Sequence, residues 1–347
     1  MQLVNKPVSL IMFFLSLLLL LLVILGIGIG AVWIPPLEVL SLAGGHLDGS
    51  SAAYQGQMLS HDIIIWSIRL PRVLLGAMVG TSLSVAGAIF QGLFRNPMAD
   101  PYVIGVSSGS ALGAVAAILL LGSTGLRYSY SIPAFAFVCA ILTIFLVYSL
   151  ARTGGKVPVM TLLLAGIAVN SFLSALQSLA MFYSGDQMHQ VVFWLLGGFS
   201  SRGWEYIWMF MPYALIGTVI AFIYARELNG MLIGEEQAQH LGIDVERVKI
   251  MLLTASALLV GASVSVSGLI GFVGLIIPHV VRLLIGPDHR KLLPMVALTG
   301  AIFMVGADIL ARTIIAPEEL PVGVVTALIG GPFFIYLLRR HKTALYK

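Results

Sequence analysis

The sequence predicts an all-α, polytopic membrane protein with about ten transmembrane helices and an inverted internal repeat. Hydrophobic residues make up 59% of the 347 residues, and only 10% are charged. Five long runs carry no charge, at 7–37, 73–94, 101–126, 157–185 and 250–281. Because crossing a hydrocarbon core of ~30 Å takes about 20 apolar residues, each run can supply at least one transmembrane helix. This composition excludes a soluble fold.

The first apolar run begins at Pro7 and predicts a transmembrane helix rather than a signal peptide. It is far longer than the ~7–15 apolar residues of a signal peptide's central region. The run 250–281 is too long for one span, and Gly268, Gly271, Gly274 and Pro278 offer a break within it. We therefore expect a single transmembrane domain over residues 1–347, with helices at 8–34, 70–94, 105–122, 133–151, 158–182, 206–226, 250–268, 271–286, 294–315 and 321–339.

The basic residues orient the chain in the membrane. With both termini in the cytoplasm, 14 of the 19 lysines and arginines fall on the cytoplasmic side. This asymmetry obeys the positive-inside rule. The remaining five lie outside and are Arg69, Arg72, Arg127, Arg202 and Arg312.

Two segments of the chain resemble each other at an offset of 181 residues, 80–97 and 261–278, with seven of 18 positions identical. The second copy begins five predicted helices after the first, so the copies, at about 69–182 and 250–340, cross the membrane in opposite senses. Inverted repeats of this kind are typical of transporters whose pathway lies at the repeat interface. Small residues recur on one helix face in both copies and favour close packing: Gly80, Ser84 and Gly87, and Gly261, Ser265 and Gly268.

Residues 226–249 form one long polar segment, with 8 charges in 24 residues, which we place in the cytoplasm. Within it, 234–242 predicts a short helix that has Ala238 and Leu241 on one face and ends at Gly242. A helix this short needs a partner surface for stability. The segment is therefore either a solvated loop or a docking helix for a soluble partner.

The sequence shows no motif for binding a nucleotide, a metal ion or a nucleic acid. The only Gly-Lys pair, Gly155-Lys156, does not form a nucleotide-binding P-loop, so any ATP must be bound by another subunit. Cys139 is the single cysteine, and the histidines show no metal-ligand spacing, so we expect no metal site. Basic residues are scattered through short loops, which favours contact with membrane lipid over binding of nucleic acid.

A few charged residues lie within or beside the predicted helices. Asp308 and Arg312 stand at i and i+4 and can form an intramembrane ion pair. This pair is either functional or a local ion pair that relieves desolvation. Arg69 and Arg72 share a face at the outer start of a helix, where they either present positive charge to the exterior or contact lipid headgroups.

Seven motifs together resemble the FecCD family, the permease subunits of ABC importers for iron-siderophores, haem and vitamin B12. In order, they are Arg69-Leu-Pro-Arg72, Arg95-Asn-Pro-Met-Ala-Asp-Pro101, Leu162-Leu-Leu-Ala-Gly166, Trp194-Leu-Leu-Gly-Gly198, Gly271-Phe-Val-Gly-Leu-Ile-Ile-Pro-His279, Asp308-Ile-Leu-Ala-Arg312 and Glu319-Leu-Pro-Val-Gly-Val-Val-Thr326. The resemblance implies ten helices and a homodimer in the cytoplasmic (inner) membrane of a bacterium or archaeon. It also implies two cytoplasmic ATPase subunits that bind ATP and Mg, and an extracytoplasmic substrate-binding protein.

The resemblance also assigns roles to residues of this chain. The segment that contacts the ATPase includes Gly234, Glu235, Glu236, Gln237, Ala238, Leu241 and Gly242. Arg69, Arg72 and Arg312 match arginines that engage acidic residues of the binding protein. Val159 and Met160 stand where relatives can carry hydroxyl-bearing residues at the cytoplasmic gate, so this chain departs from that pattern.

We therefore predict the permease subunit of an ATP-driven importer of a metal chelate, either an iron-siderophore or haem, with no catalytic residues of its own. Vitamin B12 import is the alternative within the family. An ion-coupled secondary transporter is the rival class, but it normally needs acidic groups at the membrane midplane, where Asn170 and Gln177 are the clearly polar residues. An intramembrane enzyme is the third hypothesis, and this sequence shows none of the paired catalytic groups that such an enzyme needs.

Overall fold

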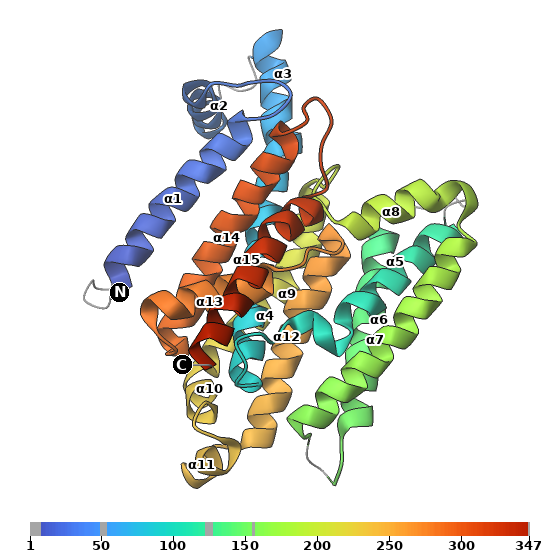
Figure 1. Ribbon diagram of the computed structural model, residues 1–347. Helices are drawn as coiled ribbons and strands as arrows, with labels where there is room; N and C mark the ends of the chain where they lie inside the picture. The colour runs from blue at the N-terminus through green and yellow to red at the C-terminus, as the bar shows by residue number, and fades with distance from the viewer. Residues whose placement is uncertain (1–7, 49–53, 122–127, 155–156, 346–347) are drawn as a thin grey trace.

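The computed structural model describes residues 8–48, 54–121, 128–154 and 157–345. The described chain is an all-α bundle without β-strands (Figure 1). Seven helices are long and apolar enough to cross a membrane, and three shorter apolar helices accompany them. The long ones are α1 (Val8–Gly28), α3–α4 (Gln57–Leu93), α6 (Tyr128–Ala151), α7 (Val159–Phe182), α9 (Trp204–Ile223), α12 (Val245–Ser267) and α14 (His289–Thr313). The shorter ones are α5 (Val106–Leu121), α13 (Val273–Ile285) and the apolar part, Val322–Leu337, of α15 (Val322–Leu345).

Each of the ten predicted helices has a counterpart among these, so the predicted fold class is confirmed. The break predicted within 250–281 is also confirmed, and it falls at Gly268, whose φ of 70° ends α12. Pro278, by contrast, lies inside α13 and breaks nothing. Because Gly268 lies outside α12, it cannot belong to the predicted helical stripe of small residues.

The structure corrects the region between the first two predicted spans. Helix α1 ends at Gly28 rather than at 34, and α2 (Pro36–Asp48) follows it. The second span begins at Gln57 rather than at 70, because α3 (Gln57–Ile63) continues through a π-helical segment, Ile64–Arg69, into α4 (Leu70–Leu93). A proline usually marks the start of a helix, because it has no N–H group to donate to the preceding turn. Here a π-helical segment, which has a wider hydrogen-bond spacing, directly precedes the turn that contains Pro71, and the helix continues through it.

Helix α4 lies at the centre of the bundle and is almost entirely buried. Glycines permit its close contacts with other helices: a Cβ at Gly80 would collide with the backbone of Gly300 in α14, and one at Gly87 with Gly274 in α13. The close packing predicted for the small residues of α4 is thus confirmed.

Short helices lie at the ends of the bundle. Helix α8 (Met188–Leu196) follows α7, and α10 (Ala225–Met231) and α11 (Glu235–His240) connect α9 to α12. We call the end that carries α2 and α3 the outer end, and the end that carries α10 and α11 the inner end. Figure 1 shows α1 running toward the outer end and α15 running toward the inner end.

Candidate functional site

Two arginines at the outer end bind the last carbonyl groups of α1. Arg69 Nη1 donates to the carbonyls of Ile27 and Gly28 at 2.9 and 2.8 Å. Arg312 donates to those of Ile29 and Gly26 at 3.1 and 3.0 Å. The final carbonyls of a helix have no partner within it and form the negative end of its dipole, so guanidinium groups stabilise them. Both arginines therefore serve as C-terminal caps of α1.

The third arginine, Arg72, joins two carboxylates that are distant in sequence. Its Nε and Nη2 donate to Asp308 Oδ1 at 3.0 and 2.9 Å, and its Nη1 contacts both carboxylate oxygens of Glu319 at 2.9 and 2.8 Å. Arg312 Nε lies 3.1 Å from Asp308 Oδ2, so the predicted i, i+4 ion pair is present. Two cations and two anions thus cancel one another in a network that is buried except at Glu319, whereas the sequence predicted only the local pair.

Glu319 connects this network to the loop that precedes α9. Its carboxylate accepts a hydrogen bond from Ser200 Oγ at 2.7 Å. Burial alone would raise the pKa of Glu319, but the hydrogen bond from Ser200 and the positive charges of Arg72 and Arg312 outweigh it and lower the pKa. Glu319 is therefore ionised at neutral pH.

Neither environment predicted for Arg69 and Arg72, the exterior or lipid headgroups, is found in this conformation, and Arg312 is buried as well. The role of the three in docking a binding protein stays a prediction. Only 5–6% of each residue is exposed, and each guanidinium has partners within the chain. The sequence could not reveal this, because the α1 carbonyls and the Glu319 carboxylate come from remote segments. For these arginines to bind a partner's carboxylates, they would first have to release their own contacts.

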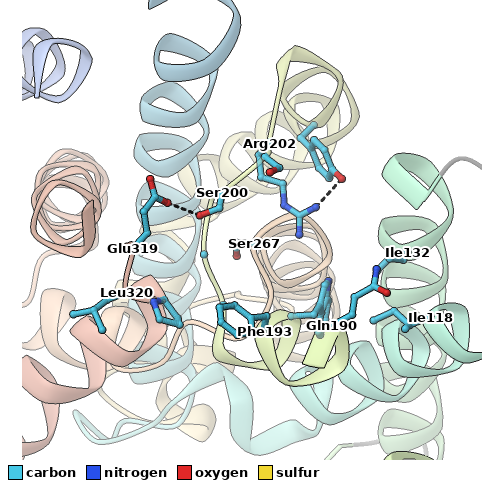
Figure 2. A pocket seen from close by; sticks show the side chains of 15 residues that line it. Ile118, Ile132, Gln190, Phe193, Ser200, Arg202, Ser267, Glu319 and Leu320 are labelled. Atoms are coloured by element: carbon cyan, nitrogen blue, oxygen red, sulfur yellow. Dashed lines mark hydrogen bonds between the residues drawn. The ribbon is translucent and has the colours of Figure 1, made fainter. Parts of the chain in front are cut away.

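A cavity of about 440 Å³ opens at the outer end beside α8. Helix α8, the loop from Gly197 to Arg202, the start of α9, the loop before α15 and the ends of α5 and α6 enclose it (Figure 2). Arg202 and Glu319 are its charged lining residues, and Gln190, Ser200 and Ser267 add polar groups. Figure 2 shows the side chain of Arg202 reaching from its loop into this space. Sequence reasoning placed Arg202 outside the membrane but gave it no role.

At the inner end, the predicted short helix exists as α11 and ends where expected. Gly242, with φ of 82°, follows its last turn, and the Gly242 and Ile243 N–H groups donate to the carbonyls of Gln239 and Ala238. This pair of bonds is the Schellman motif that commonly closes helices with glycine. The predicted stop is confirmed.

The predicted docking face of α11 needs correction. Ala238 is fully buried against the chain's own residues, whereas Leu241 is 66% exposed, so the two do not share an accessible face. In so short a helix, Leu241 is already the C-terminal cap residue, where helical spacing no longer holds. Ile233, which is 62% exposed just before α11, provides a second apolar side chain that sequence reasoning missed.

A buried lysine ties α11 to the start of α7. Lys249 Nζ contacts Glu235 at 2.6 Å and Glu246 at 3.2 Å, and it donates to the Val157 carbonyl at 3.3 Å. The Val157 N–H in turn donates to Glu246 Oε2 at 3.2 Å. The network therefore connects α11, α12 and the residues directly before α7.

The residues predicted at the gate begin helix α7. Val159 is half-buried, and Met160 is 69% exposed. They directly follow Val157 and Pro158, so any movement of the Lys249 network would reach them first. Their role at a gate stays a prediction.

The chain matches the FecCD transport family over residues 18–340. The chain belongs to this family. The hemin transport system permease of Yersinia pestis is 44% identical over 284 residues, which cover 80% of this chain and 84% of that protein. The cobalamin import system permease of Halobacterium salinarum is 49% identical over 277 residues, which cover 80% and 73%.

A solved structure is similar to this chain over nearly its whole length. That structure is described as an inward-facing conformation of a metal-chelate type ABC transporter. It shares 32% sequence identity, covers 96% of this chain and 99% of its own, and has a TM-score of 0.82. Because FecCD proteins are membrane subunits of ABC importers whose ATPase activity belongs to separate subunits, this membership favours an ABC importer over an ion-coupled secondary transporter.

Proposed function

We propose that this chain is the permease subunit of an ATP-driven ABC importer that moves a metal chelate, either an iron-siderophore or haem, across the cytoplasmic membrane. The observation that carries the proposal is the family match over residues 18–340 on a ten-helix bundle similar to a metal-chelate type transporter. The permease provides the pathway and performs no covalent chemistry.

The energy source in this proposal is a pair of cytoplasmic ATPase subunits that bind ATP and Mg. Helix α11 and its flanks supply the contact, with Ile233 and Leu241 as the apolar anchors in place of Ala238. Two large apolar side chains, each more than 60% exposed on an otherwise polar segment, suit a protein partner's groove. The Lys249 network then transmits movement of α11 to the start of α7.

A homodimer with the pathway between its subunits is supported by the exposed face of α7. In the most apolar 18-residue stretch of α7, only 17% is buried within the chain. Exposed serines line one stripe, at Ser171, Ser174 and Ser178. Such a stripe suits a second copy or a water-containing pathway better than lipid tails.

The proposed orientation places both termini and α11 in the cytoplasm, and the outer end toward a substrate-binding protein, in a bacterial or archaeal membrane. The 14 of 19 basic residues assigned to the cytoplasm support it. The inverted repeat, copies at about 69–182 and 250–340, remains part of this proposal.

Vitamin B12 is the second candidate cargo. It is supported by the 49% identity to the cobalamin import permease of Halobacterium salinarum, which exceeds the 44% to the hemin permease.

Reconstituted import would test the proposal. The permease, its ATPase and its binding protein would be placed in liposomes, and uptake of haem, iron(III) citrate, a hydroxamate siderophore and vitamin B12 would be compared. Import of an iron chelate or haem supports the first candidate, and import of vitamin B12 alone supports the second. A complex that hydrolyses ATP but moves none of these would refute chelate import.

A further inference from the structure

We propose that the outer cavity beside α8 is a binding subsite for a carboxylate group of the transported chelate, with Arg202 as its cationic anchor. The inference rests on the proposed function and narrows it to chelates that carry an anionic carboxylate.

The Arg202 guanidinium is fixed by Tyr206 and still has a donor without a partner. Its guanidinium stacks over the Tyr206 ring, with Cζ 4.5 Å from the ring centroid, and its Nη1 donates to Tyr206 Oη at 2.6 Å. Tyr206 is only 4% exposed, so it forms a fixed platform. Arg202 Nε is buried and lacks a hydrogen-bond partner among the described residues. A buried donor without a partner is costly, and a ligand that accepts from it would relieve that cost.

Arg202 also differs from the other arginines described at the outer end. Arg69 and Arg312 cap α1, and Arg72 is paired with Asp308 and Glu319. Arg202 forms no ion pair with any carboxylate in the described part of the chain.

The charge balance of the cavity favours an anion. Glu319 lines the cavity too, but Arg72 and Ser200 already bind its carboxylate. The two cations and two anions of that network cancel. Arg202 therefore leaves the cavity with one uncompensated positive charge.

The walls of the cavity indicate a small organic ligand. A volume of about 440 Å³ lies within the range of roughly 300–1,000 Å³ that is usual for ligand pockets. Apolar side chains face the same space as the guanidinium, namely Ile118, Ile132, Phe193 and Leu320. An apolar wall beside one cation fits an amphipathic anion, and the forked donors of arginine match a carboxylate.

Haem and haem dimethyl ester are a matched pair of probes, because the ester keeps the macrocycle and removes both carboxylate charges. Binding would be measured on the permease–ATPase complex in nanodiscs, through quenching of tryptophan fluorescence. Trp194 lines the cavity and serves as the reporter. The variants are Arg202→Gln and Arg202→Lys, with Arg152→Gln at an exposed inner position as the control.

We expect the wild-type complex to bind haem about 10- to 100-fold more tightly than its ester. Arg202→Gln should abolish that preference by weakening haem binding alone, and Arg202→Lys should retain part of it. If Arg202→Gln does not assemble with the ATPase, Tyr206→Phe, which keeps the ring but removes the hydrogen bond to Nη1, should reduce the preference. Equal affinities for the two probes in the wild type, or an unchanged preference in Arg202→Gln, would overturn the subsite.

One further measurement, docking of the binding protein, distinguishes a ligand subsite from a protein-docking contact. A second, uptake, distinguishes a failure of the subsite from a failure of the proposed function. Docking of the cargo-free binding protein should be equal in the wild type and Arg202→Gln, and a loss of docking with an unchanged haem preference would assign Arg202 to the protein interface instead. Uptake by the wild type tests the proposed function independently. Normal chelate import with no effect of Arg202→Gln refutes the subsite alone, whereas absence of import of every chelate refutes the function.

Discussion

Replacing Lys249 with methionine should uncouple ATP hydrolysis from transport. The lysine side chain is 6% exposed and bridges Glu235 of α11, Glu246 of α12 and the carbonyl of Val157 before α7. Methionine fills a similar volume but leaves two carboxylates near each other without a cation. We expect α11 to lose its connection to α7 while it keeps its exposed apolar side chains.

The expected cost follows from the exposure of the partners. Breaking a fully buried ion pair typically costs ~3–5 kcal/mol. Glu235 and Glu246 are 33% and 26% exposed, so water regains part of their hydration and we expect a loss of ~1–3 kcal/mol. This loss should loosen the contact without unfolding the bundle, because the apolar core around Lys249 continues through α4, α5 and α12.

The assay is the ratio of cargo molecules imported to ATP molecules hydrolysed by the reconstituted importer. The ratio should fall severalfold in Lys249→Met, with ATPase activity retained. Lys291→Met is the control, because Lys291 is an exposed lysine at the start of α14. The double variant Glu235→Gln, Lys249→Met should recover part of the stability but not the ratio, because it removes one unpaired charge without restoring the link from α11 to α7. An unchanged ratio in Lys249→Met would refute the role of this network in coupling.

Two other predictions concern the ends of the bundle. Leu241→Asp should weaken ATPase binding by roughly 10- to 100-fold, because burying a leucine contributes ~1.5–3 kcal/mol, and affinity measured in nanodiscs with Arg152→Gln as a control would check this. A normal affinity would exclude Leu241 as an anchor. At the outer end, the lowered pKa of Glu319 means that its stabilising contribution is complete above the ordinary value of 4.5 and is lost as the pH falls through the lowered value. The thermal midpoint of the wild type should therefore drop in acid more than that of Glu319→Gln, and parallel pH profiles would contradict the assignment.

The transmembrane helices could be predicted from sequence because each depends on a local property, a run of apolar residues. The break after α12 was equally local, since Gly268 adopts a backbone conformation that favours glycine. The start of the second span was not, because the sequence does not show that a π-helical segment precedes Pro71, or that Arg69 and Arg72 find partners within the chain.

The site depended more on tertiary contacts than the fold did. The pair of Asp308 and Arg312 was visible at i and i+4, but Arg72 joins it across 236 residues. Ala238 and Leu241 stand three apart in sequence, yet the helix ends between them, so one is buried and the other exposed. Arg202 gave no signal beyond its charge, because its significance comes from a cavity that several segments build together.

The central claim is that ATP, bound by separate subunits, drives transport through this chain. The most direct measurement is uptake of a chelate, supplied with its binding protein, into liposomes that contain the permease with or without its ATPase, and with or without ATP on the ATPase side. The account predicts uptake only when both ATPase and ATP are present, and unchanged uptake after ionophores collapse the ion gradients. Uptake by the permease alone, driven by an ion gradient, would contradict it.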